Sequence, residues 1–241
     1  MSELDIQGIG MTSQRTRDRL IDRLQQKGIK NPDVLRVMRL VPRHLFVDEA
    51  MASRSYEDSA LPIGHGQTIS QPYIVARMTE LLLEGGQDKN NKDGGFKAEK
   101  VLEVGTGSAY QAAVLGGLVK ELHTVETIPA LYRHSRDILY KLGYRNIRTH
   151  LGDGSWGWPD AAPYDAIIVT AAAGEIPKAL IQQLKIGGRM VIPVGDQNAE
   201  QILQVVTRTD EKNVSITEHG AVIFVPLVSL SHELSRPDIL K

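Results

Sequence analysis

The chain has 241 residues, of which 41% are apolar, so it is long enough to bury a core in one large α/β domain. Its 28 Lys and Arg residues are balanced by 29 Asp and Glu residues, and a net charge of -1 gives no general attraction for nucleic acid or an acidic membrane. Cysteine is absent and the His residues lack HxH and HxxxH spacings, so thiolate chemistry is excluded and we expect no metal.

The sequence also sets expectations for location and partners. No window approaches the roughly 20 apolar residues of a membrane span. The N-terminus MSELDIQGIG has neither a basic nor an apolar signal region. We therefore expect a cytoplasmic protein, a monomer, with no nucleic-acid or membrane partner.

The first 60 residues are typical of a helical segment. Leu20, Ile21 and Leu24 fall on one face of a helix predicted from Arg15 to Gly28, and Asn31-Pro32 predicts the start of a second, short helix. We expect residues 1–60 to form an N-terminal helical cap.

The next elements are a loop, a helix and a polar segment. The loop GHGQTISQPY, residues 64–73, carries no formal charge and leads into QPYIVARMTELLLEGG, which has the periodicity of an amphipathic helix ended by glycine. The segment 86–100 is strongly charged and has little to bury, so we expect a mobile surface loop there.

Strand-like and helix-like segments alternate from residue 100 onward. The predicted strands are KVLEV, ELHTVE, NIRTH, YDAIIV, GRMVIPV, QILQVVT and AVIFVPL, and the predicted helices span 109–119, 131–142 and 176–184. Such alternation indicates a doubly wound, mostly parallel, Rossmann-like α/β sheet. The last two strands have no long helix between them, so we expect an antiparallel pair at or near the sheet edge.

The first strand of this sheet runs through a glycine turn into a helix. Gly105 and Gly107, with Thr106 between them, permit a tight turn where a ligand can approach free N–H groups at the helix start. A nucleotide-like cofactor suits this turn. Tyr110 stands where the dinucleotide fingerprint requires glycine, which argues against NAD or FAD.

Three carboxylates lie at or just before the ends of consecutive strands. These are Glu103, Glu126, which can accept hydrogen bonds from a ribose, and Asp153, which is followed by Gly154 at a turn and can reach an adenine amino group. Their charge disfavours a phosphate-bearing cofactor and favours S-adenosylmethionine, which carries a sulfonium and an amino group. Each has an alternative explanation: Glu126 as a helix N-terminal carboxylate and Asp153 as an Asx-turn.

By these residues the sequence resembles the protein-L-isoaspartate O-methyltransferase family. The resemblance is carried by VPRHLFV, PIGHGQTISQPYIVARMTELL, VLEVGTGSAYQAAVL, LGYRNI, GDGSWGWPDAAPYDAIIVTAAAGEIP, QLKIGGRMVIPVG and FVPL. It implies an enzyme that uses S-adenosylmethionine, releases S-adenosylhomocysteine, and methylates the free α-carboxylate of isoaspartyl residues in damaged proteins. Two features depart from the family pattern: Ala109 stands where glycine is usual, and the segment 86–100 is longer than expected.

The resemblance also implies site residues. It places the active-site serine at Ser70, with Thr68 and Ile69 beside it as substrate-binding residues, and it places Glu103 near the methionyl end of the cofactor. Ser70 could equally be the cap of the helix that begins near Pro72.

A main-chain substrate needs room to approach. The alanines that include Ala171 and Ala172 follow the fourth strand of the sheet, and Val225 lies near the last, so we expect these residues to contact the substrate peptide. The alanines could also be a simple strand-to-helix turn.

We expect one domain over residues 1–241, with a catalytic core at 61–227 and a tail at 228–241.

Two rival functions remain open at this point: a methyltransferase for a small-molecule acid, and a non-catalytic protein that only binds the cofactor.

Overall fold

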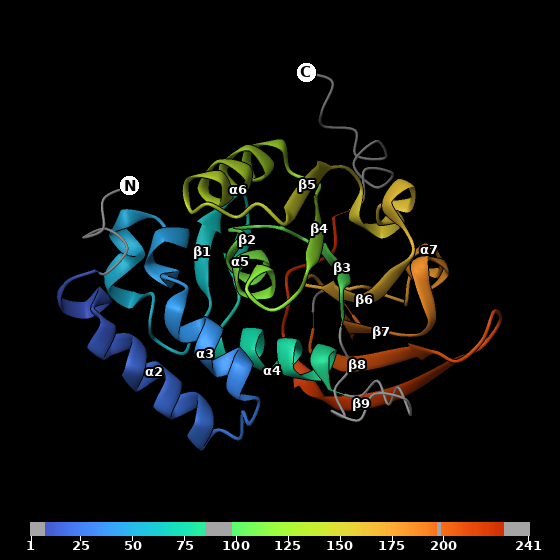
Figure 1. Cartoon of the computed structure of the whole chain (residues 1–241), viewed down its shortest axis with the longest axis horizontal. Helices are drawn as coiled ribbons and strands as arrows, with labels where there is room; N and C mark the ends of the chain where they lie inside the picture. The colour runs from blue at the N-terminus through green and yellow to red at the C-terminus, as the bar shows by residue number, and fades with distance from the viewer. Residues whose placement is uncertain (1–7, 85–97, 197–198, 229–241) are drawn as a thin grey trace.

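The computed structural model describes residues 8–84, 98–196 and 199–228 and has a seven-stranded sheet at its centre (Figure 1). Its strand order is β5-β4-β3-β6-β7-β8-β9. The strands are β3 (Lys100–Val104), β4 (Glu121–Glu126), β5 (Ile147–Leu151), β6 (Tyr164–Val169), β7 (Leu184–Val194), β8 (Gln201–Arg208) and β9 (Val214–Val222). The five strands from β3 to β7 pair in parallel, and β8 is antiparallel to both β7 and β9. The predicted doubly wound sheet and its antiparallel end are confirmed.

The last strand differs from its prediction. The apolar run AVIFVPL was expected to form it, but β9 runs from Val214 to Val222 and so contains only the first two residues of that run. Residues 223–227 leave the sheet: Ala172 N donates to Val225 O at 2.8 Å, and Leu227 N donates to Ala172 O at 2.8 Å. Most of β9 is exposed at the sheet edge, so its sequence lacks the apolar run of a buried strand.

Alternation along the buried strands divides the core into two layers. Val101 of β3 and Ile168 of β6 pack in the layer with the N-terminal helices, α4 and α5, whereas Leu102 and Ile167 face the layer that includes α7. All four side chains are fully buried. The sheet is therefore covered on both faces, as parallel strands require.

The helical cap precedes this sheet. It contains α2 (Gln14–Gln26), α3 (Pro32–Leu40) and the short 3-10 helices η1 (Gly10–Thr12), η2 (Arg43–Phe46) and η3 (Glu49–Arg54). Leu20 and Leu24 are buried, and Asn31 Oδ1 accepts from the backbone of Asp33 and Val34 at the start of α3. Both predicted helices of this region are confirmed.

The remaining helices lie between the strands. They are α4 (Pro72–Leu83), α5 (Tyr110–Gly116), α6 (Pro129–Lys141) and α7 (Lys178–Gln183), with η4 (Gly154–Trp156) and η5 (Pro159–Ala161). The helices predicted within 109–119, 131–142 and 176–184 are present with shifted ends. No helix in the described ranges is both long and apolar enough to cross a membrane.

A two-stranded hairpin was not predicted. It consists of β1 (Leu61–Gly64) and β2 (Gln67–Ile69), which pair antiparallel and lie between the cap and α5 (Figure 1). Strands of four and three residues are too short for alternation to mark them. Residues 86–97 of the predicted surface loop at 86–100 and residues 229–241 of the predicted tail lie outside the described residues, and the division into cap, core and tail stays a prediction.

Ala109 has an unusual backbone conformation. It precedes α5 with φ 71° and ψ 7°, in the left-handed region that favours glycine, and it is fully buried. The departure from the usual glycine therefore puts strain at the start of the helix. Its effect on cofactor affinity stays a prediction.

We expect Ala109→Val to lower the free energy of unfolding by more than about 2 kcal/mol, because a β-branched side chain tolerates the left-handed region poorly and overpacks a buried site. Ala109→Gly should change it by less than about 1 kcal/mol, since relief of strain offsets the lost methyl contacts and the freer unfolded chain. Urea unfolding measures both. Ala113→Val, equally buried within α5, is the control for overpacking alone. Equal losses at the two positions would contradict a backbone contribution at Ala109.

Candidate active site

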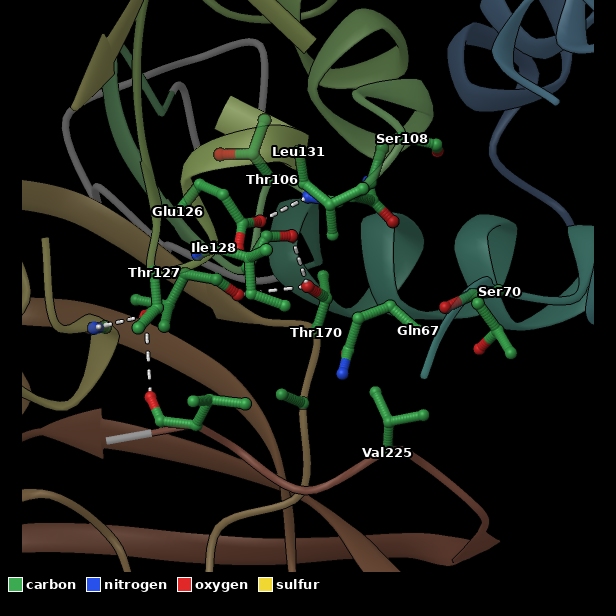
Figure 2. Close-up of a pocket in the computed structure, with 18 of the residues that line it drawn as sticks. Gln67, Ser70, Thr106, Ser108, Glu126, Thr127, Ile128, Leu131, Thr170 and Val225 are labelled. Atoms are coloured by element: carbon green, nitrogen blue, oxygen red, sulfur yellow. Dashed lines mark hydrogen bonds between the residues drawn. The ribbon is translucent and has the colours of Figure 1, made fainter. Parts of the chain in front are cut away.

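A cleft of about 700 Å³, including the space at its mouth, opens beyond the carboxyl ends of β3, β4 and β6. It lies where the chain crosses from one half of the sheet to the other, the usual ligand position in doubly wound folds. The lining residues are Gln67, Thr68, Ile69, Ser70, Val75, Val104, Gly105, Thr106, Gly107, Ser108, Tyr110, Gln111, Glu126, Thr127, Ile128, Leu131, Gly154, Thr170, Ala171, Val225, Pro226, Leu227 and Val228. Figure 2 shows Ser70 and Gln67 at one end and Glu126 and Thr127 at the other.

The predicted glycine turn forms the floor of the cleft. Gly105 has φ 95°, and a Cβ there would lie 2.6 Å from Thr170 Oγ1. The Thr170 hydroxyl is within hydrogen-bonding distance of two carbonyl oxygens, 3.0 Å from that of Val104 and 2.7 Å from that of Gly105. Glycine is therefore required both by the backbone conformation and by this close approach from β6.

Glu126 is the single formally charged side chain among the described lining residues. Its carboxylate accepts from Gly107 N at 2.7 Å and from Ile128 N at 2.8 Å, so it links the glycine turn to the N-cap residue of α6. Glu126 is therefore held at a helix N-terminus, as its alternative interpretation has it, and it also lines the cleft, while its binding of a ribose stays a prediction. Two carboxylate oxygens with these two donors retain lone pairs for a ligand.

Glu103 does not line the cleft. Alternation along β3 sends its side chain to the same face as Val101, where Thr124 Oγ1 donates to Glu103 Oε2. Thr124 Oγ1 in turn lies 2.7 Å from Thr106 Oγ1, so Glu103 reaches the turn only through two hydroxyls. Burial raises the pKa of Glu103 to about 8, which favours the neutral acid at pH 7.

Asp153 also lies outside the cleft lining, although Gly154 is part of it. Asp153 Oδ1 accepts from Ser155 N at 2.9 Å and from Ser155 Oγ at 2.7 Å, which is an Asx-turn at the start of η4. The simpler of the two interpretations of Asp153 therefore accounts for its carboxylate in this structure.

Ser70 is not the cap of α4. The N-cap residue is Gln71 and makes no side-chain cap, and Tyr73 N instead donates to the carboxylate of Asp58 at 2.9 Å. Within the described residues the hydroxyls of Ser70 and Thr68 make no hydrogen bond with the protein. The alternative interpretation of Ser70 was wrong, and both hydroxyls are available to a ligand.

The alanines after β6 are divided between two environments. Ala171 lines the cleft, but Ala172 is fully buried because the segment from Val225 to Leu227 pairs with its backbone. The chain's own segment therefore occupies the place beside Ala172 where a substrate peptide was predicted to bind. That segment brings Val225 into the cleft wall, and its predicted contact with a substrate peptide stays a prediction.

A second, wider groove of about 930 Å³ adjoins the cleft. It shares Thr68, Ser70, Thr170 and Val225 with the cleft, and its other lining residues are Ala60, Gln71, Ile74, Glu200, Ala221, Val222, Ile223 and Phe224. Ser70 therefore lies at the boundary between the two spaces.

The described residues contain no group of three or more His, Cys, Asp or Glu side chains that could hold a metal ion.

Several lining residues were not identified from the sequence. Thr127 and Thr170 directly follow the strands that end in Glu126 and Val169, so the strand-end rule that indicated Glu126 could have found them. Gln67, Gln111 and Leu131 gave no such signal, because they reach the cleft from a hairpin strand and two helices.

The buried acid at Glu103 makes stability depend on pH. In the unfolded chain it loses its proton near pH 4.5 and in the folded protein near pH 8, so the folded state binds more protons between these values and is destabilised as pH rises. We expect Glu103→Gln in the cofactor-free protein to remove this loss: its stability relative to wild type should increase from pH 5 to pH 8 by up to about 1.4 kcal/mol per pH unit. Urea unfolding across this range measures the effect. Parallel pH profiles of the two proteins would contradict it.

Residues 15–232 match the sequence profile of the family described as Protein-L-isoaspartate(D-aspartate) O-methyltransferase. A relative described as a protein-L-isoaspartate O-methyltransferase, from Pseudomonas fluorescens, is 53% identical over 219 residues, which is 91% of this chain and 98% of the relative. One of the same description from Stenotrophomonas maltophilia is 54% identical over 224 residues, covering 92% and 93%.

Solved structures of this description have the same fold. One protein-L-isoaspartate O-methyltransferase has a TM-score of 0.76 at 27% identity, over 87% of this chain and 65% of that chain. A Plasmodium falciparum protein, in complex with S-adenosyl-L-homocysteine, shares the fold with a TM-score of 0.70 at 22% identity, over 88% of this chain and 98% of that one. From its profile match, its close relatives and its fold, the chain belongs to the protein-L-isoaspartate(D-aspartate) O-methyltransferase family.

Proposed function

We propose that this chain is an S-adenosylmethionine-dependent carboxyl O-methyltransferase that methylates the free α-carboxylate of L-isoaspartyl residues in damaged proteins and so initiates their repair. The observation that carries the proposal is the junction at Ser70: a narrow cleft at the strand ends meets a wider groove, and Thr68 and Ser70 line both. Methyl transfer needs such a junction, because donor and acceptor must meet at one point from two directions.

The cleft suits S-adenosylmethionine. Among the described lining residues there is no Lys, Arg or His side chain that would neutralise a phosphate, whereas Glu126 favours a cation. The structure of the Plasmodium falciparum relative contains the corresponding product, S-adenosyl-L-homocysteine. When bound, this cofactor supplies an electrophilic methyl group on a sulfonium.

Five residues of the cleft would hold the cofactor directly. The backbone at Gly105, Thr106 and Gly107 leaves space at the floor, and Glu126 offers acceptor oxygens for ribose hydroxyls. Gly154 leaves room at the wall formed by Val104. Glu103 and Asp153 act behind these groups, Glu103 by supporting the Thr124 and Thr106 hydroxyls and Asp153 by shaping the turn before η4.

The acceptor needs orientation rather than a base. A carboxylic acid of ordinary pKa, about 4, is ionised at neutral pH and is already the nucleophile. Ser70 and Thr68 would donate hydrogen bonds that aim one carboxylate oxygen along the line of transfer, and Ile69 and Val225 would help to exclude water. Because an anion and a cation combine, the charge decreases in the transition state and a pocket with little water favours it.

The wider groove would hold the polypeptide on either side of the isoaspartate. It is lined by backbone and side chains from Ala221 to Val225, and Ile223 is 81% exposed, which leaves an apolar contact for the substrate. A small-molecule acid would not need this groove. The proposal extends to a monomeric enzyme that acts in the cytoplasm. It also extends to the lack of nucleic-acid and membrane partners, and only this last part is supported by the near-zero net charge.

Methyl incorporation from labelled S-adenosylmethionine tests the activity. With two peptides that differ only in L-isoaspartate or L-aspartate at one position, we expect label in the isoaspartyl peptide alone, and its loss in mild base as a methyl ester. A panel of free small acids serves as the control for the rival acceptor. Cofactor binding without label in any acceptor would favour the rival of a non-catalytic binding protein and contradict the proposal.

Ser70→Ala tests the role of the hydroxyl. A lost hydrogen bond to a charged group is worth about 1.5–3 kcal/mol, so we expect kcat/KM for the isoaspartyl peptide to fall roughly tenfold to a hundredfold. A fall in kcat at constant KM would identify an interaction made in the transition state, and a rise in KM would identify one made in binding. S-adenosylhomocysteine affinity should not change. The matched control is Ser215→Ala, exposed on β9 and outside both cavities. Unchanged kinetics in Ser70→Ala would remove Ser70 from the mechanism.

A further inference from the structure

The motif VPRHLFV contains a buried charge that the proposed function leaves without a role. Arg43, at the start of η2 in the helical cap, is fully buried. Burial lowers the pKa of Arg43 to about 10, so the guanidinium is still charged at pH 7. A buried charge without compensation is costly, so its contacts indicate what it is for.

Arg43 joins the two ends of the segment that carries the acceptor residues. Its Nε donates to Ser55 O at 2.8 Å, and its Nη2 donates to Ser70 O at 2.8 Å. Between these two carbonyls lie the β1–β2 hairpin and Thr68. One planar guanidinium therefore fixes the main chain of Ser70 against the cap, and leaves the Ser70 hydroxyl free at the junction of the cleft and the groove.

The same guanidinium contacts the cofactor side. Its Cζ lies over the ring of Tyr110, 4.8 Å from the centroid, and that ring also packs edge-on against Phe46 at 5.6 Å. Tyr110 lines the cleft and begins α5 directly after the glycine turn. Arg43 is thus in contact with the loop of residues 64–73, called the acceptor loop below, and with Tyr110, the first residue of the helix that follows the turn at Gly105 and Gly107.

The charge of Arg43 is not neutralised by an ion pair within the described residues. Its Nη1 has no hydrogen-bond partner there. Asp58 is the carboxylate that acts on it electrostatically, and Asp58 is itself held by Lys27 and by Tyr73 N. The acceptor loop is next to this positive charge, which no ion pair neutralises within the described residues, and the loop carries no formal charge of its own, so an anion bound there would be stabilised.

We propose that Arg43 is the positioning residue of the acceptor site: it fixes the main chain at Ser70 and provides the positive charge that selects a carboxylate over a neutral group beside the Ser70 hydroxyl. The inference rests on the proposed function, because it assumes that the acceptor carboxylate binds at this loop. It assigns the cap a part in recognising the substrate's charge.

The experiment compares two peptides that differ at one group. One carries isoaspartate with its free carboxylate, and the other carries isoasparagine with a neutral carboxamide in the same place. Dissociation constants are measured with the protein saturated with S-adenosylhomocysteine, and the ratio of the two constants is the carboxylate preference. Wild type is expected to prefer the carboxylate at least tenfold. Arg43→Met, which keeps the apolar bulk and removes the charge, should lose most of this preference while its S-adenosylhomocysteine affinity changes less than threefold.

Arg43→Lys separates charge from geometry. Lysine keeps the charge but cannot span the carbonyls of Ser55 and Ser70 with one planar group, so we expect the carboxylate preference to stay within threefold of wild type and kcat to fall at least tenfold. Arg17→Met is the matched control. Arg17 is a second buried arginine of the cap, 5.9 Å from the Tyr56 ring centroid, and its replacement should leave the preference unchanged.

The outcomes separate the hypotheses. Equal weakening of both peptides in Arg43→Met would mean a structural role only and would overturn the inference. If Arg43→Met does not fold, Arg43→Lys decides: loss of preference with the charge retained would also overturn it, as would a wild type without preference. Absence of methylation of the isoaspartyl peptide by wild type would instead be a failure of the proposed function.

Discussion

The parallel pairing of β3 with β6 is the constraint on which the site depends. The two strands end side by side, and Thr170 closes the junction by contacting the carbonyls of Val104 and Gly105. That contact leaves no room for a side chain at Gly105, so the turn after β3 passes close to β6 and the cleft opens directly beyond it. Glu126 is held to the same turn through Gly107 N. Cleft residues that follow three strands are thus fixed relative to one another by short hydrogen bonds between the Thr170 and Glu126 side chains and the backbone of the glycine turn and its neighbour Val104.

Residues of the cap make the hydrogen bonds that hold the acceptor loop and the start of α4, so the side chain of Ser70, in that loop, is not needed for them. A serine just before a helix that begins with proline would ordinarily satisfy the first N–H groups of that helix. Here Asp58 performs that task for α4, and Arg43 holds the carbonyl of Ser70. Both groups come from the segment before the hairpin. The hydroxyl of Ser70 therefore has no hydrogen-bond partner in the described protein, and because Ser70 is half-buried at the junction of two open spaces, the hydroxyl is available to a ligand.

Periodicity explains which parts of this structure the sequence could predict. The buried strands and the helices between them follow from alternating and 3.6-residue patterns, and the strand-end rule indicated Gly105, Glu126 and Gly154 correctly as cleft residues. The same rule could not show that the Glu103 side chain points away from the cleft and toward Thr124, because that depends on which face of β3 is toward α5. Nor could it separate Ala171 from Ala172, since only the folded chain shows that residues 225–227 cover the second alanine. The β1–β2 hairpin and the polar edge strand β9 lack the patterns on which such prediction relies.

The charges of the site are arranged in the order that the reaction requires. Glu126 is the single charged group in the described lining of the cleft, and it lies at the end away from Ser70 (Figure 2). Glu103, behind the turn, is kept largely neutral at pH 7 by burial, so it does not add a second negative charge there. The buried positive charge of Arg43 lies at the opposite end, behind the acceptor loop. A cationic donor is therefore favoured at one end and an anionic acceptor at the other, with no charged side chain among the described lining residues between them. Because the two charges cancel as the methyl group moves, a protein that places its own charges behind each reactant, and none between them, stabilises both reactants in position without opposing the transfer.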